Sequence, residues 1–157
     1  MTSLMDHERG LRAPVPPAHH GHCLGPACRD VMTLPSQPSA VGAARVHAQQ
    51  VLSEWGFGRQ LCLDVTLCLS ELVTNAIQAS AVLRPAAAPV HIALAHERHW
   101  LLLAVADASP RFPLRLAADG DAIGGRGLAM VEALSTRWGW HPVSWPGLAK
   151  VVWAEWR

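Results

Sequence analysis

The feature that most constrains the fold is one long apolar stripe between residues 60 and 82, which includes the run LCLSELVTNAIQAS (67–80). At about 100° per residue, its apolar side chains fall on a single face of a helix. They are Leu61, Val65, Cys68, Leu69, Leu72, Ala76 and Ala79. A helix with one apolar face must bury that face against another layer, so this stripe predicts a layered domain.

Two polar residues lie beside this stripe, one helical turn apart. Asn75 falls roughly 80° from the centre of the stripe and Glu71 roughly 120°, both on the same side. We therefore expect both at the rim of the core, where a side chain can meet a ligand. An Asn carbonyl oxygen suits Mg²⁺, and a Glu can orient or deprotonate a hydroxyl or a water. An ordinary polar border on an amphipathic helix is the alternative.

The remaining segments predict an α+β fold. Residues 39–56 indicate a helix with Ser39 as its N-cap and Gly56 as its end. Alternating apolar residues at 90–94 and 101–105 predict a β-hairpin with its turn at 96–99. The other expected elements are a strand near 30–34, a helix over 128–135 and a hairpin of 137–145 with 148–156. This order predicts a two-layer α/β sandwich, with a mostly antiparallel mixed sheet and helices on one face.

Size and charge exclude several classes of protein. The chain has 157 residues, half of them hydrophobic, which suits one domain with its own core. Its formal net charge of +1 gives no argument for direct nucleic-acid binding. No uninterrupted apolar run approaches the roughly 20 residues of a membrane span, and no secretory signal is visible. We therefore expect a cytoplasmic protein that does not bind membranes.

The first 28 residues differ from the rest of the chain. They are rich in Pro, Gly and His and show no helical or alternating period, so they predict a flexible tail ahead of a domain at 29–157. A metal site in the tail is the alternative, although paired Cys-x-x-Cys spacing is missing. Its candidate ligands are His19, His20, His22, Cys23 and Cys28.

Two further segments carry candidate chemistry. Asp107 shares a strand face with Leu101, Leu103 and Val105, which places a carboxylate on the core side at a strand end. A buried carboxylate needs a hydrogen-bond donor, and the amino group of a bound base would supply one. The glycine-rich run at 124–128 opens a predicted helix, whose free N–H groups suit an anion. The alternatives are an Asp that caps a turn and a plain flexible connector.

Together these segments resemble a known family. Glu71 to Ala76 (ELVTNA) resembles the N box of the GHKL ATPases, the group that includes histidine kinases, gyrase and Hsp90. Val105 to Pro110 (VADASP) resembles their first glycine box, and Gly124 to Val131 (GGRGLAMV) resembles the second. Within this superfamily, residues 30–157 are most similar to the small anti-sigma-factor serine/threonine kinases.

The resemblance implies a role for each matching residue. Asn75 would be the Mg²⁺ ligand, Asp107 would accept from the adenine amino group, and Glu71 would be the catalytic base for a protein serine. The second box would surround the phosphates with Gly125, Arg126, Gly127 and Leu128, and Ser109 belongs to the adenine-side box. Lys150, in the last predicted strand, is a further candidate to reach the nucleotide.

The first box departs from the family pattern Asp-x-Gly-x-Gly, because Ser109 and Arg111 stand where the glycines would be. The resemblance implies ATP and Mg²⁺ as cofactors, a sigma factor or similar regulator and an antagonist protein as partners, and a homodimer. The missing glycines make a non-catalytic, ATP-gated partner-binding module the main alternative. A metal-responsive tail is the third hypothesis. A sensory histidine kinase is disfavoured, because the chain has no sensor segment and no helix pair with a phospho-acceptor His.

Overall fold

The computed structural model describes residues 27–81, 88–111, 113 and 126–157. These residues form five strands and three helices. In chain order the elements are β1 (Ala27–Leu34), α2 (Ser39–Glu54), α3 (Arg59–Ala81), β2 (Val90–Glu97), β3 (Trp100–Asp107), α4 (Arg126–Leu134), β4 (Arg137–Trp145) and β5 (Leu148–Trp156).

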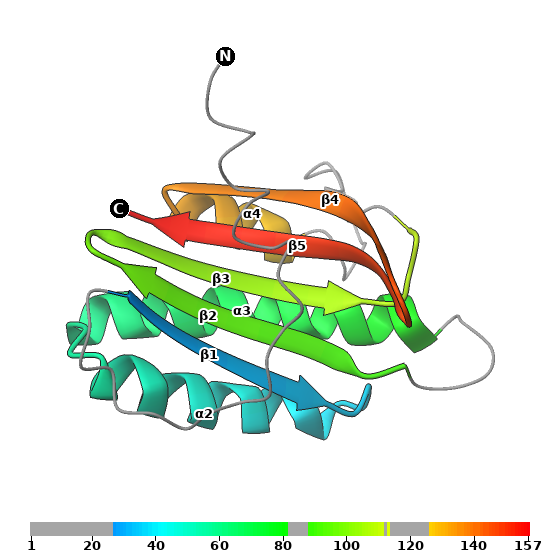
Figure 1. Ribbon diagram of the computed structural model, residues 1–157, viewed down its shortest axis with the longest axis horizontal. Helices are drawn as coiled ribbons and strands as arrows, with labels where there is room; N and C mark the ends of the chain where they lie inside the picture. Colours follow the sequence, from blue (N-terminus) through cyan, green and yellow to red (C-terminus); the bar gives the residue numbers. More distant parts are fainter. Residues whose placement is uncertain (1–26, 82–87, 112, 114–125) are drawn as a thin grey trace, which may run out of the picture.

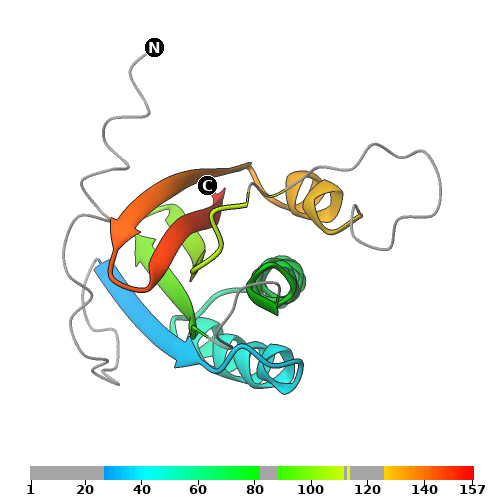
Figure 2. The same ribbon diagram turned by 90° about the vertical axis from the view of Figure 1, so that its right-hand side faces the viewer.

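The five strands form one sheet in the order β1-β2-β3-β5-β4, and every neighbouring pair is antiparallel. All three helices lie on the same face of this sheet (Figures 1 and 2). The α+β prediction is therefore confirmed, as a two-layer arrangement whose sheet is antiparallel throughout its described strands.

The main core lies between the sheet and the helices. Helix α3 contributes the predicted stripe, and Val65, Leu69 and Leu72 on it are buried. Helix α2 faces this core with small residues at four-residue intervals, Ala44 and Ala48 among them, and their size allows close packing. By length and composition alone α3 could also cross a membrane. In this fold it is instead the central core helix, and α2 and α4 flank it (Figure 2).

Strand β3 is the central strand, and its residues from 101 to 107 are buried on both faces. Leu103 and Val105 face the helices. Ala104 and Ala106 face the other way, into a smaller cluster with Val151 that is partly covered by other apolar side chains. Asp107 follows the helix-facing alternation and ends the strand at the inner side of the sheet.

Most helix and strand ends lie near the residues that the sequence predicted. Gly56 adopts a φ of +81° just after α2, as the predicted helix end requires. The β2–β3 turn consists of Arg98 and His99 and is shorter than the predicted turn at 96–99. Arg98 has a φ of +54°. The predicted N-cap is wrong: Ser39 is the first residue of α2, Pro38 precedes it, and no side chain caps the helix. Residues 1–26 of the expected tail lie outside the described part.

Candidate functional site

The polar edge of α3 lies where the sequence predicted it. Glu71 and Asn75 are both half-buried, between the core stripe and the exposed side of the helix. Ser70 and Thr74 bond back to the helix, each donating its hydroxyl to the carbonyl oxygen four residues earlier, at 2.8 and 2.7 Å. Glu71 and Asn75 have no hydrogen-bond or ion-pair partner within the described residues. Their polar atoms therefore remain available to a ligand.

The Glu71 side chain lies against the first turn of α4. A Cβ atom at Gly127 would collide with its Oε2 and stand 3.3 Å from its Cδ, so any larger residue here would require the flexible end of the Glu71 side chain to move. The backbone N–H groups at a helix N-terminus favour negative charge, which suits this position of Glu71. The structure thus brings the N-box helix and the second glycine-rich segment into direct contact.

Asp107 is the centre of a buried polar cluster at the end of β3. Its side chain is 1% exposed, and Oδ1 accepts from the Ser109 backbone N–H at 2.8 Å and from Lys150 Nζ at 2.7 Å. Lys150 Nζ also donates to the Ser109 carbonyl oxygen at 3.0 Å. The carboxylate is therefore buried as predicted, but its first donors come from the chain itself.

The electrostatics of Asp107 combine opposing effects. Burial raises the pKa of its carboxyl above the ordinary value, because the charged form loses water contacts. The Lys150 ammonium and the Ser109 N–H act in the other direction and partly offset that rise. Lys150 is thus the principal group that keeps a charged Asp107 tolerable in the core.

The sequence had pointed to Lys150 only as a residue within reach of a nucleotide. Its pairing with Asp107 was missed, although a signal was present, because Lys150 is the chain's only lysine and sits on the apolar face of a strand. The register between β3 and β5 places Asp107 directly opposite Lys150, and this brings the two side chains together.

The second glycine-rich segment is described only in part. Gly125 lies outside the described residues, and so does the side chain of Arg126, whose backbone begins α4. Gly127 is buried, and Leu128 is a core residue. Leu128 therefore anchors the first turn of α4 to the core.

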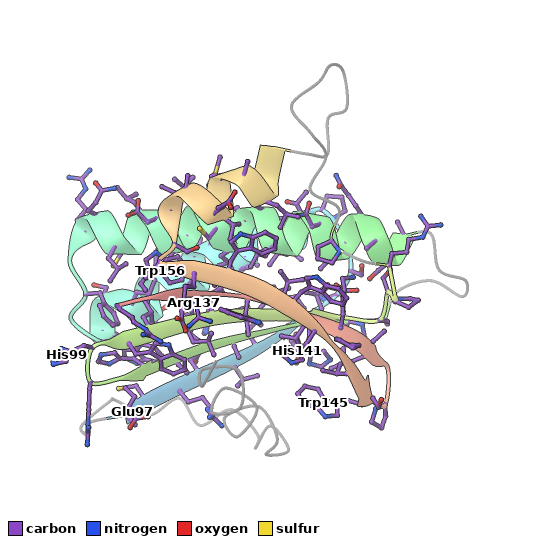
Figure 3. The ribbon with its side chains drawn as sticks, turned by 90° about the horizontal axis from the view of Figure 1, so that it is seen from above. Glu97, His99, Arg137, His141, Trp145 and Trp156 are labelled. Carbon is purple, nitrogen blue, oxygen red and sulfur yellow. The ribbon has the colours of Figure 1, made fainter. Side chains whose placement is uncertain are left out.

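A separate hollow of about 380 Å³ opens near the start of α3, lined by Gln49, Ser53, Phe57, Arg59, Cys62 and Leu63. Phe57 packs edge-on against His96, near the β2–β3 turn. Figure 3 shows that turn, marked by Glu97 and His99, at the opposite end of the sheet from Trp145. Asp107 and Lys150 belong to the Trp145 end, so this hollow is not part of the candidate site.

The described residues contain no cluster of three or more potential metal-ligating side chains. The His/Cys tail lies outside them except for Cys28, which is disulfide-bonded and so offers no thiolate. The structure thus adds nothing in favour of a metal-responsive tail.

Comparison with known proteins places this geometry in a family. The histidine kinase-like ATPase domain matches residues 34–147, most of the chain. Among curated proteins, no sequence matches. A similar fold occurs in the crystal structure of the RsbU and RsbW domains of Rv1364c from Mycobacterium tuberculosis, with a TM-score of 0.62 and 21% sequence identity.

That match covers 83% of this chain and 32% of the mycobacterial chain, so this protein spans about a third of its length. The matched family region contains α3, β3, α4 and their polar residues. The chain therefore belongs to the histidine kinase-like ATPase domain family.

Proposed function

We propose that this protein is an ATP-binding regulator of the anti-sigma-factor serine/threonine kinase type, acting in the cytoplasm. It would bind a sigma factor or similar regulator and release it when an antagonist protein engages. The observation that carries the proposal is the contact of Glu71 with Gly127 at the start of α4. That contact puts an acid-base group beside a helix N-terminus suited to phosphate.

The described residues fit a Mg²⁺-bound nucleotide. Asn75 has an amide without a partner in the described structure, and its carbonyl oxygen is a suitable Mg²⁺ ligand. Asp107 retains Oδ2 as a hydrogen-bond acceptor at the strand end. When bound, Mg²⁺ would offset the negative charge of the phosphates. Asn75 would then hold the phosphate end of ATP, and Asp107 would hold its adenine.

Glu71 is suited to proton transfer in a kinase reaction. In the proposed step it accepts the proton of a partner's serine hydroxyl, while the serine oxygen forms a bond to the γ-phosphorus. The bond from that phosphorus to the β–γ bridging oxygen breaks, and ADP leaves. The half-buried position of Glu71 beside Gly127 supports this role.

A non-catalytic, ATP-gated binding module is the second candidate. The observation that favours it is the clamped turn after β3, where Lys150 holds both Asp107 and Ser109 in a segment without the usual glycines. A stiff turn is compatible with nucleotide binding and with partner recognition. The same stiff turn limits how far the backbone after β3 can move around the nucleotide during phosphotransfer.

The primary test is calorimetric titration of Mg²⁺-ATP into wild type and Asn75→Ala. Loss of a metal ligand should weaken binding by about tenfold or more, since a polar contact to a charged group contributes about 1.5–3 kcal/mol. Gln78→Ala, an exposed change on the same helix, is the matched control and should bind like wild type.

Chelation of Mg²⁺ should abolish the difference between Asn75→Ala and wild type, because Asn75 acts through the metal. Equal Mg²⁺-ATP affinity in the two proteins would contradict the Asn75 assignment. A wild type that does not bind ATP at all would overturn the proposed function.

A further inference from the structure

The Asp107–Lys150 pair is unusual in its placement. Both side chains point to the helix-facing side of the sheet, where they are only 1% and 5% exposed. Burial of an ammonium and a carboxylate costs several kcal/mol for each ion unless further hydrogen bonds compensate. An apolar residue would fill a purely structural core position at lower cost, so a functional role explains this lysine better than packing does.

The hydrogen bonds of the pair leave one donor and one acceptor unused. Oδ1 of Asp107 already accepts two hydrogen bonds, from Lys150 and from the Ser109 backbone. Lys150 Nζ has three N–H donors, of which Oδ1 and the Ser109 carbonyl oxygen take two. Among the described residues, Oδ2 and the third N–H have no partner.

We propose that Lys150 is a base-reading residue, which donates its third N–H to ring nitrogen N1 of adenine while Asp107 Oδ2 accepts from the adjacent 6-amino group. This inference rests on the proposed function, since it assumes that ATP binds with its base at the end of β3. The role of Asp107 belongs to that function, and the role of Lys150 is the new element.

The unused groups match adenine better than guanine. The Watson–Crick edge of adenine presents one amino donor beside one ring acceptor, which one carboxylate oxygen and one N–H satisfy together. Guanine presents two donors beside its carbonyl oxygen, so one donor would lack an acceptor here. A buried polar group without a partner loses its hydrogen bonds to water without replacement, which disfavours GTP.

The hydrogen bonds around Asp107 also fix the positions of the groups proposed to contact adenine. Lys150 and the Ser109 N–H hold Asp107 from two sides, so the free acceptor and donor are oriented before the nucleotide arrives. Such preorganisation reduces the entropy lost on binding. The hydrogen bonds that rigidify the turn thus also orient the groups that recognise adenine.

The test uses nucleotide analogues that differ from ATP by one ring atom. Wild type should bind 1-deaza-ATP, which lacks N1, about 10- to 100-fold more weakly than ATP, as expected for a lost hydrogen bond to a charged group. The matched control is 3-deaza-ATP, which lacks a ring nitrogen away from the Watson–Crick edge and should bind nearly like ATP.

The second part of the test measures the same two affinities, for ATP and for 1-deaza-ATP, in the Lys150→Met variant. In this variant the preference for ATP over 1-deaza-ATP should disappear, because no donor faces N1. A thermal melt checks that the variant is folded. If it is not, the wild-type analogue series decides alone.

The possible outcomes distinguish the role of Lys150 from the proposed function. Normal ATP binding with equal affinity for 1-deaza-ATP would overturn the role of Lys150 and leave the proposed function standing. A folded Lys150→Met that still discriminates against 1-deaza-ATP would also overturn it. Absence of ATP binding by wild type would overturn the proposed function and this inference together.

Discussion

Asp107 and Glu71 are both acidic candidates for function, but their surroundings give them different chemistry. Asp107 is buried and hydrogen-bonded at Oδ1 by the chain itself, so it acts as a fixed acceptor. Glu71 is half-buried and has no hydrogen-bond or ion-pair partner in the described structure, so the chain itself does not occupy its carboxylate oxygens. At the residue scale, this contrast supports the proposed roles, in which Asp107 recognises the base and Glu71 transfers the proton.

Glu71→Gln tests whether the protein is a kinase. The amide keeps the shape of the side chain but cannot accept a proton, so ATP affinity should stay nearly unchanged. Transfer to a partner's serine should fall by about 10²- to 10⁴-fold, the usual contribution of a general base. The measurement is transfer of radiolabelled phosphate from ATP to the captured antagonist protein.

A non-catalytic module would behave differently in the same assay. Wild type would then transfer no phosphate to any partner serine, and Glu71→Gln would change nothing. Absence of labelled serine under all conditions, with normal ATP binding, would reject the kinase assignment and favour the ATP-gated binding module.

Cys68 provides a test of the core around α3. Burial raises the pKa of its thiol from 9.0 to about 12, and nearby Asp64 adds to the rise. The folded protein therefore keeps this proton where the unfolded chain loses it, so the free energy of unfolding should fall as pH rises from about 9 toward 12.

The same burial should protect Cys68 from alkylation. In native protein at pH 8, iodoacetamide should leave Cys68 unmodified, because the thiol is buried and protonated. In urea it should react fully. Peptide mass spectrometry gives the result, and rapid labelling of Cys68 in folded protein would contradict the packing of α3.

At the scale of elements, the contact between α3 and α4 depends on a missing side chain. Gly127 lets Glu71 lie against the first turn of α4, and Leu128 and Val131 then continue into the core. A glycine inside a helix costs about 0.5–1 kcal/mol relative to alanine. Its presence here is explained by the space that the Glu71 carboxylate occupies.

Gly127→Ala should therefore show energetic coupling to Glu71. In wild type, the new Cβ displaces the carboxylate and cancels the gain from better helix propensity. In a Glu71→Ala background the same change should stabilise the protein by about 0.5–1 kcal/mol. Urea unfolding of the four proteins measures this coupling.

Gly42 supplies the control for that cycle. It lies within α2 with no atom near its would-be Cβ, so Gly42→Ala should stabilise both backgrounds equally. Equal effects of Gly127→Ala with and without Glu71 would show that the two residues do not touch in solution.

At the scale of the whole molecule, the described sheet begins with β1, which is also its first strand along the chain. The pairing of β1 with β2 begins at Ala27 opposite Glu97, and β1 forms one edge of the sheet. A protein of residues 27–157 should therefore fold and bind Mg²⁺-ATP as well as the full-length chain does. Circular dichroism and calorimetry measure both properties.

Removal of residues 1–26 would give a different result if the tail carried a structural metal. The full-length chain would then contain a stoichiometric metal ion, detected by elemental analysis, and the shortened protein would lack it. That result would restore the His/Cys tail as a functional site.

The sequence by itself determined the elements and the identity of the polar edge of α3. Periodicity of apolar residues is a local property, so the stripe of residues 60–82 and the alternation through 90–107 were sufficient to predict the helix, the hairpin and the inward side of Asp107. The half-buried positions of Glu71 and Asn75 followed from the same helical geometry.

Only the tertiary structure decided which of these groups meet. Lys150 lies 43 residues from Asp107 along the chain, and the pair exists because β5 inserts between β3 and β4 in one register. Glu71 meets Gly127 because α4 packs beside α3. Such contacts depend on long-range packing and strand pairing, whose register no local pattern specifies.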